Sequence, residues 1–223
     1  MKKQQTGFTL IELAIVLVII GLLLGGVLKG QELINSAKVK NMATDFKNIQ
    51  VYIYGYQDRY RALPGDDRLA NTHVTGGTVA TTGTSGNGVI EGQWNSVTTT
   101  EESFLFWQHV RLAGFAAGPT TFATPAELAL YTPTNADGGR IGVQSVSGFT
   151  KITGPTTAMS GAFVICSDGI LGRFATQLDT TLDDGETSTG SVRAIATANS
   201  GDALTTAVVN ASPAASYTVC MSF

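Results

Sequence analysis

The chain opens with a polar stretch followed by an unbroken hydrophobic run. Residues 1–7 include Lys2 and Lys3, and nearly every residue from Phe8 to Leu28 is apolar. As an α-helix, a run of about 21 residues rises roughly 31 Å, close to the hydrocarbon thickness of a bilayer. Lysines ahead of such a run keep that end in the cytoplasm. The pattern therefore predicts one membrane-spanning helix whose far end faces outward.

Beyond Lys29 the hydrophobic run gives way to helical periodicity. Apolar residues recur at spacings of three and four, at Val39, Met42, Phe46, Ile49, Ile53, Tyr56 and Tyr60. Such spacing places them on one helical face, and Pro64-Gly65 ends the pattern. We therefore expect one helix over about 8–61, with 29–61 amphipathic. Its stripe packs either against the rest of the chain or in a coiled-coil seam, and the sheet-rich region that follows favours the first.

Four glycines interrupt the apolar part of this helix, at positions 21, 25, 26 and 30. Glycine weakens a helix, so these positions allow local unwinding in an assembly. Small residues also allow neighbouring membrane helices to approach closely. Both interpretations remain open from the sequence.

The remaining residues, 62–223, are expected to form a globular head. A second helix is predicted over 101–117, where Phe104, Trp107 and Val110 have helical spacing. Short alternating segments separated by Gly, Pro, Asn and Asp predict strands, at 140–147, 161–167, 192–198, 204–209 and 216–222. Their short connections favour antiparallel pairing. The predicted fold is α+β: a long N-terminal helix, membrane-spanning in its first half, on a head with an antiparallel sheet.

One acidic residue, Glu12, interrupts the hydrophobic run. A carboxylate in a membrane helix costs about 2.5 kcal/mol or more, so it usually has a function and a partner. No other charged residue lies between Phe8 and Leu28, so we expect that partner outside this segment or at the end of the chain itself. A cleaved signal peptide would have a shorter apolar core followed by small residues, and a plain membrane anchor leaves Glu12 unexplained.

Residues 2–12, KKQQTGFTLIE, and the apolar helix after them resemble the start of type IV prepilins and type II secretion pseudopilins. The resemblance implies cleavage after Gly7 by a prepilin peptidase and methylation of Phe8, the new N-terminus. Because cleavage would leave a positive amine at Phe8, we hypothesise that Glu12 of one subunit neutralises the Phe8 amine of its neighbour and so sets their axial register. A looser resemblance to pilin-like proteins extends to about residue 118, through RALPGDD at 61–67 and the Gly86-Asn87-Gly88 turn.

The family resemblance predicts a structural rather than an enzymatic role. The chain would be an inner-membrane precursor, surrounded by lipid, with its head outside the cytoplasm. It would then join like subunits in a helical filament, periplasmic or extracellular, on an inner-membrane assembly platform. Pilin and pseudopilin remain alternatives. A monomeric membrane-anchored binding protein, or adhesin, is the alternative from another class.

The two cysteines, Cys166 and Cys220, each lie in a predicted strand. In an exported protein, two cysteines most simply form one disulfide, whereas a cytosolic protein would keep them as thiols. The direction of the membrane helix favours the disulfide. A nucleophilic Cys166 with His109 and Asp168 is conceivable, yet nothing in the sequence singles it out, and common catalytic motifs are missing.

Charge and metal-ligand chemistry complete the sequence-based expectations. The net charge of −3 gives no broad basic surface, so bulk nucleic-acid binding is not expected. Asp179, Asp183, Asp184 and Glu186 gather hard oxygen ligands beside a glycine, which suits Ca²⁺, although the spacing is not that of an EF-hand. A solvated acidic turn is the alternative, and no cofactor is required for the predicted role.

Overall fold

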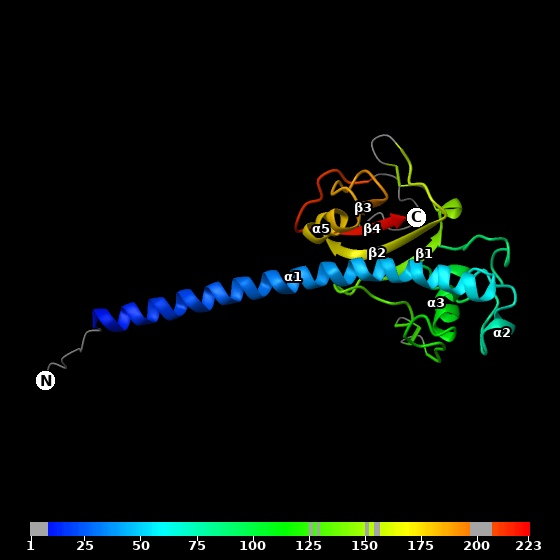
Figure 1. Ribbon diagram of the computed structural model, residues 1–223, viewed down its shortest axis with the longest axis horizontal. Helices are drawn as coiled ribbons and strands as arrows, with labels where there is room; N and C mark the ends of the chain where they lie inside the picture. The colour runs from blue at the N-terminus through cyan, green and yellow to red at the C-terminus, as the bar shows by residue number, and fades with distance from the viewer. Residues whose placement is uncertain (1–8, 125–126, 129, 150–151, 154–156, 197–206) are drawn as a thin grey trace. The chain divides into compact units, whose positions relative to one another are not determined.

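The computed structural model describes residues 9–124, 127–128, 130–149, 152–153, 157–196 and 207–223. The chain divides into two compact units, Met1–Lys38 and Val39–Phe223. The protein is α+β: a long apolar N-terminal helix and a head that contains a four-stranded antiparallel sheet (Figure 1). This is the fold class that the sequence predicts.

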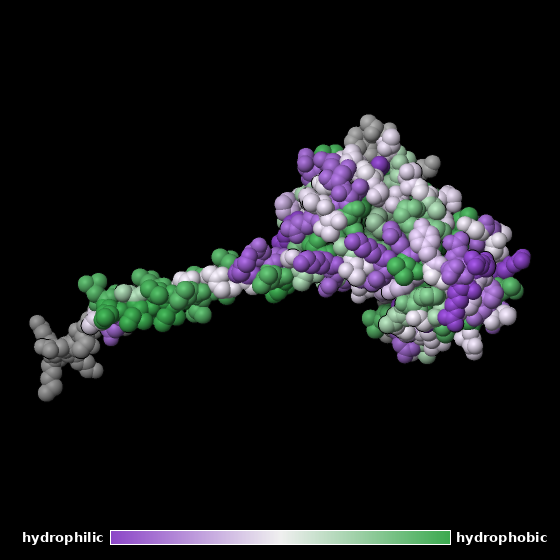
Figure 2. Space-filling view, viewed as in Figure 1, coloured by the Kyte–Doolittle hydropathy of each residue, from purple (hydrophilic) through white to green (hydrophobic). Residues whose placement is uncertain are grey.

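Helix α1 (Leu10–Tyr60) begins in the first unit and supplies the apolar part of it. Large hydrophobic side chains are exposed here, for example Leu17 at 69% and Leu23 at 63%. Figure 2 shows the resulting hydrophobic surface along this stretch. An 18-residue window of α1 has a mean hydropathy of 2.8, and by length and composition α1 is the one helix among the described residues able to cross a membrane. The four glycines lie within regular α-helix.

The second half of α1 belongs to the head and buries a stripe of side chains. The buried positions are Val39, Met42, Ala43, Phe46, Ile49, Ile53 and Tyr56. They belong to the main hydrophobic core or lie beside it, which confirms that the stripe packs within the chain. The helix ends at Tyr60, and Arg61 follows in the left-handed conformation (φ 56°), a common helix terminator.

The sheet is antiparallel throughout, with strand order β1-β2-β4-β3. Its strands are β1 (Ile141–Ser145), β2 (Phe163–Leu171), β3 (Val192–Ala196) and β4 (Ser216–Ser222). Alternation along β2 separates two cores, because Phe163 and Ile165 join the α1 stripe whereas Val164 and Cys166 join a second cluster. The head thus has one sheet with a hydrophobic cluster on each face.

Among the described residues, the head also contains helices and a short 3-10 turn. They are α2 (Ala70–His73), α3 (Glu102–Leu112), η1 (Val146–Gly148) and α5 (Gly172–Leu182). Helix α3 lies within the predicted 101–117 segment, and four predicted strands correspond to β1–β4. The predicted 204–209 strand is wrong in its described part, since 207–209 are irregular, and 204–206 lie outside the described residues. Helix α5 was not expected from the sequence.

Candidate functional site

The first turn of α1 is closed by a reciprocal set of hydrogen bonds between Thr9 and Glu12. The Thr9 amide and hydroxyl both donate to Oε2 of Glu12, at 2.8 Å and 2.7 Å. In return, the Glu12 amide donates to the Thr9 hydroxyl at 3.4 Å. This arrangement is a capping box, in which side chains satisfy backbone N–H groups that a helix start leaves unpaired.

Glu12 therefore has hydrogen-bond partners inside its own segment, and the charged partner expected from outside that segment stays a prediction. The capping box provides hydrogen-bond donors, and Thr9 is neutral, so these bonds do not cancel the negative charge, which is unfavourable in a membrane. A carboxylate has about four lone-pair sites, so Glu12 retains capacity for a further donor. Gly7 and Phe8, the predicted cleavage residues, lie outside the described residues, and pairing with the Phe8 amine stays a prediction.

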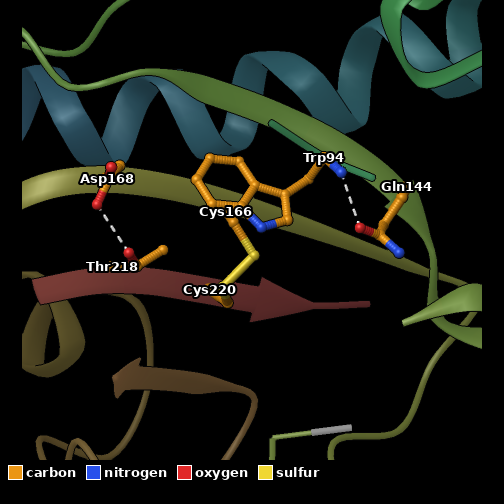
Figure 3. The surroundings of a disulfide bond; sticks show 6 residues. All are labelled: Trp94, Gln144, Cys166, Asp168, Thr218 and Cys220. Carbon is orange, nitrogen blue, oxygen red and sulfur yellow. Dashed lines mark hydrogen bonds between the residues drawn. A yellow bond between two sulfur atoms is a disulfide. The ribbon is translucent and has the colours of Figure 1, made fainter. Parts of the chain in front are cut away.

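Cys166 and Cys220 form a disulfide between the two central strands. They face each other directly in the register of β2 and β4, and both are fully buried. The indole of Trp94 lies against this disulfide in the second hydrophobic cluster (Figure 3). A hydrogen bond from the Trp94 amide to the Gln144 side chain, 2.8 Å long, holds that segment to β1.

The disulfide also removes the conceivable nucleophile. Cys166 is not a thiol, and His109 is buried with both ring nitrogens engaged. The Gly65 amide donates to its Nδ1 at 2.9 Å, and Nε2 lies 2.8 Å from the Thr78 carbonyl. Asp168 instead accepts a hydrogen bond from the Thr218 hydroxyl, beside the disulfide (Figure 3). These three residues are structural here.

The four acidic residues predicted to bind calcium are hydrogen-bonded to their own chain. Each carboxylate accepts a hydrogen bond from a nearby amide or hydroxyl: Asp179 from Gly185, Asp183 from Val192, Asp184 from Thr189 and Glu186 from Ser188. Within the part of the chain that the structure describes, no three His, Cys, Asp or Glu side chains are placed to hold a metal ion. Asp179 belongs to α5 rather than to a loop, and calcium binding by this set stays a prediction.

Two buried carboxylates have strongly raised pKa values. Burial raises the pKa of Asp179 to about 7, and the charges of Asp184 and Asp183 add to the effect. Burial likewise raises the pKa of Glu102 to about 7, with Asp66 and Glu91 nearby. Both side chains are fully buried in the head, so they influence its stability rather than its surface.

Two further carboxylates fix the chain where α1 ends. Asp67 accepts hydrogen bonds from the Tyr56 hydroxyl at 2.8 Å and the Leu69 amide at 2.9 Å, and lies 2.6 Å from Nδ1 of His73. Asp66 accepts from three consecutive amides of the glycine turn at 86–88. The amides of this turn therefore bind a carboxylate of the same chain.

The N-terminal segment has a recognisable counterpart among known protein families. Residues 2–28 match the family model for the prokaryotic N-terminal methylation motif. That motif is typical of type IV prepilins and pseudopilins, and it covers the polar N-terminal residues and the apolar part of α1. Comparison with curated proteins and with solved structures gave no match to the chain. What is known of the head therefore rests on its own sequence and structure.

Proposed function

We propose that the protein is a structural subunit of a type IV pilus-like filament, either a pilin or a type II secretion pseudopilin. The observation that carries this proposal is the methylation motif at 2–28, which coincides with a helix whose hydrophobic side chains are exposed. Apolar surface of this extent is stable in lipid or against other apolar surfaces, and it is unfavourable in water. A filament subunit needs both environments in succession.

In this proposal the precursor first crosses the inner membrane once, with its head outside the cytoplasm. Lys2 and Lys3 hold the leader on the cytoplasmic side. A prepilin peptidase cleaves after Gly7 and methylates Phe8. The disulfide between β2 and β4 supports an oxidising location for the head, because such bonds persist mainly outside the cytoplasm.

Assembly would then exchange lipid for neighbouring helices on the inner-membrane platform. The charge of Glu12 is unfavourable in both environments unless a positive group joins it. The free amine at Phe8 of an adjacent subunit supplies that group, and the pair costs less than either charge alone. The capping box explains how Glu12 is hydrogen-bonded before that partner arrives.

The role of the charge is tested by three variants expressed in cells that make the peptidase. Glu12→Val removes both the cap and the charge, Glu12→Gln keeps an acceptor for Thr9 and removes the charge, and Thr9→Ala keeps the charge. We expect all three to be cleaved, and the two Glu12 variants to yield few filaments. Normal filaments from Glu12→Gln would show that the charge is dispensable and would contradict the proposed pairing.

Gene deletion distinguishes a pilin from a pseudopilin, and the state of the isolated protein distinguishes both from an adhesin. Surface filaments that disappear on deletion identify a pilin, and lost protein secretion without surface filaments identifies a pseudopilin. A stable monomer with an uncut leader would instead identify a membrane-anchored adhesin and would contradict the proposal. We assign no catalytic step and no required cofactor to the chain.

A further inference from the structure

A groove of about 740 Å³ lies on the head beside the C-terminal end of α1. One wall is formed by Tyr54 and Gln57 of α1 and by Arg61, which follows the helix. The other walls come from the loop after α1, which carries Arg68 and Leu69, from the 86–88 turn and from the start of β2. Tyr54 is 54% exposed and Leu69 47%, so the groove combines accessible apolar surface with charged groups.

The accessible charged groups of the groove are hydrogen-bond donors. Asp66 and Asp67 line it, yet both are buried and already accept several hydrogen bonds from the surrounding chain. Arg61 and Arg68 are exposed. Arg61 has one distant ion pair, 3.8 Å from Asp58, in which both side chains are more than four-fifths exposed, and such a pair contributes little. The groove is thus suited to an acceptor-rich, negatively charged partner.

The same chain carries such a partner on another part of the head. In the turn between α5 and β3, Asp183, Asp184 and Glu186 are exposed. Their internal hydrogen bonds use only some of the lone pairs of each carboxylate. Within the head, α5 lies toward one end and α2, beside the groove, toward the other (Figure 1). The donor surface and the acceptor surface are therefore well separated on one molecule.

We propose that the groove receives the acidic turn of a second copy of this chain, through contacts of Arg61 and Arg68 with Asp184 and Glu186. A contact between two different surfaces of identical subunits leaves a free copy of each surface, so it propagates in one direction instead of closing a dimer. This inference rests on the proposed filament function and adds a contact between heads to the packing of the helices.

The test is a charge-reversal experiment on the full-length chain in cells that process it. One variant is R61E/R68E, the second is D184K/E186K, and the third combines them. Opposed like charges cost several kcal/mol, so each reversal alone should lower the filament yield roughly tenfold or more. The combined variant should restore most of it. R61K/R68K keeps both charges and is the matched control, expected to assemble like the wild type.

A second measurement locates the contact directly. Filaments of R61K/R68K carry amines in the groove, and a carbodiimide that joins amines to carboxylates should link them to the 183–186 turn of a neighbouring subunit. Mass spectrometry identifies the joined peptides, and mixed isotope labelling shows that they come from different copies.

The outcomes separate this inference from the filament function. Single reversals that assemble normally, or a combined variant that stays defective while its heads melt like the wild type, would overturn the contact and leave the filament function standing. A wild-type chain that never assembles would overturn both.

Discussion

The two halves of α1 differ in how much of their sequence is apolar and in whether the head covers their apolar side chains. In the first half, Leu17 and Leu23 are mostly exposed. In the second half, Phe46 and Ile53 are almost completely buried, and polar residues occupy the other faces. Burial in the second half follows a stripe with spacings of three and four, whereas the first half is apolar on every face and no stripe is distinguished.

This difference shows which half depends on the chain's own fold. The stripe of the second half finds its partners in the sheet and α3, so its hydrophobic free energy belongs to folding. The apolar side chains of the first half find none within the described residues and need lipid or other subunits. Folding and assembly are thus assigned to consecutive parts of one helix, and substitutions should separate them.

The largest difference between the two halves is expected when one large side chain in each half is replaced by alanine. Phe46→Ala should lower the free energy of unfolding by about 3–5 kcal/mol, because it opens a cavity in the core. Leu23→Ala should leave the free energy of unfolding of the head unchanged, since the side chain is exposed. Denaturant titration of the full-length protein in detergent micelles measures both. Equal losses would contradict the division between folding and assembly.

Removal of the disulfide should destabilise the head by a similar amount. The bond joins residues 54 positions apart, for which chain entropy gives about 4 kcal/mol, within a usual range of 2–5 kcal/mol. The variant is Cys166→Ala with Cys220→Ala, compared by denaturant titration with wild-type protein under reducing and non-reducing conditions. Reduced wild type should match the variant, and a variant as stable as the oxidised protein would refute the prediction.

The buried acid Glu102 should make the head less stable as pH rises. Burial raises its pKa from 4.5 to about 7, so between these values the folded head binds a proton that the unfolded chain has lost. The free energy of unfolding therefore falls between about pH 4.5 and 7, by roughly 1–3 kcal/mol for this group.

Glu102→Gln should make this pH dependence shallower, because it removes the titrating proton. Asp179 contributes a slope of the same sign, since its pKa is also raised, so Asp179→Asn should remove a further part. Melting temperatures of full-length protein at pH 5 and pH 8 test both substitutions. A wild-type head that is more stable at pH 8 than at pH 5 would show that the assigned direction is wrong.

The smallest effect is expected at the capping box. Thr9→Ala removes a side-chain cap, which typically costs about 0.5–2 kcal/mol and acts locally. Amide hydrogen exchange should accelerate in the first turn of α1 and remain unchanged in the head. Thr9→Ser keeps the hydroxyl and is the control. Unchanged exchange in the alanine variant would show that the cap contributes nothing in micelles.

The sequence predicts best those elements that are encoded by a sustained pattern of neighbouring residues. The apolar run follows from composition, whereas the stripe and the four strands follow from periodicity. Each is present in the structure. The Thr-x-x-Glu spacing of Thr9 and Glu12 signals a capping box and could have been recognised. Helix α5 also had a signal, because Phe174, Ala175 and Leu178 have helical spacing, but its many threonines obscured it.

Other features depend on residues far apart in sequence and left no local signal. Trp94 contacts the disulfide because its loop lies on the face of the sheet that carries the second hydrophobic cluster. No spacing in the sequence encodes that contact. The groove likewise joins the end of α1, two loops and the start of β2. Calcium binding by the acidic residues at 179–186 stays a prediction, and among the described residues no three such side chains are placed to hold a metal ion.

The most direct test of the central claim is the mass of the N-terminal peptide from protein isolated from its native membrane. The proposed function predicts a chain that starts at Phe8, with a methyl group on its amine, and an intact mass lowered by the two hydrogens lost in the Cys166–Cys220 bond. A chain that keeps its leader in cells with active prepilin peptidase would be a plain membrane anchor. That result would contradict assembly through a free Phe8 amine.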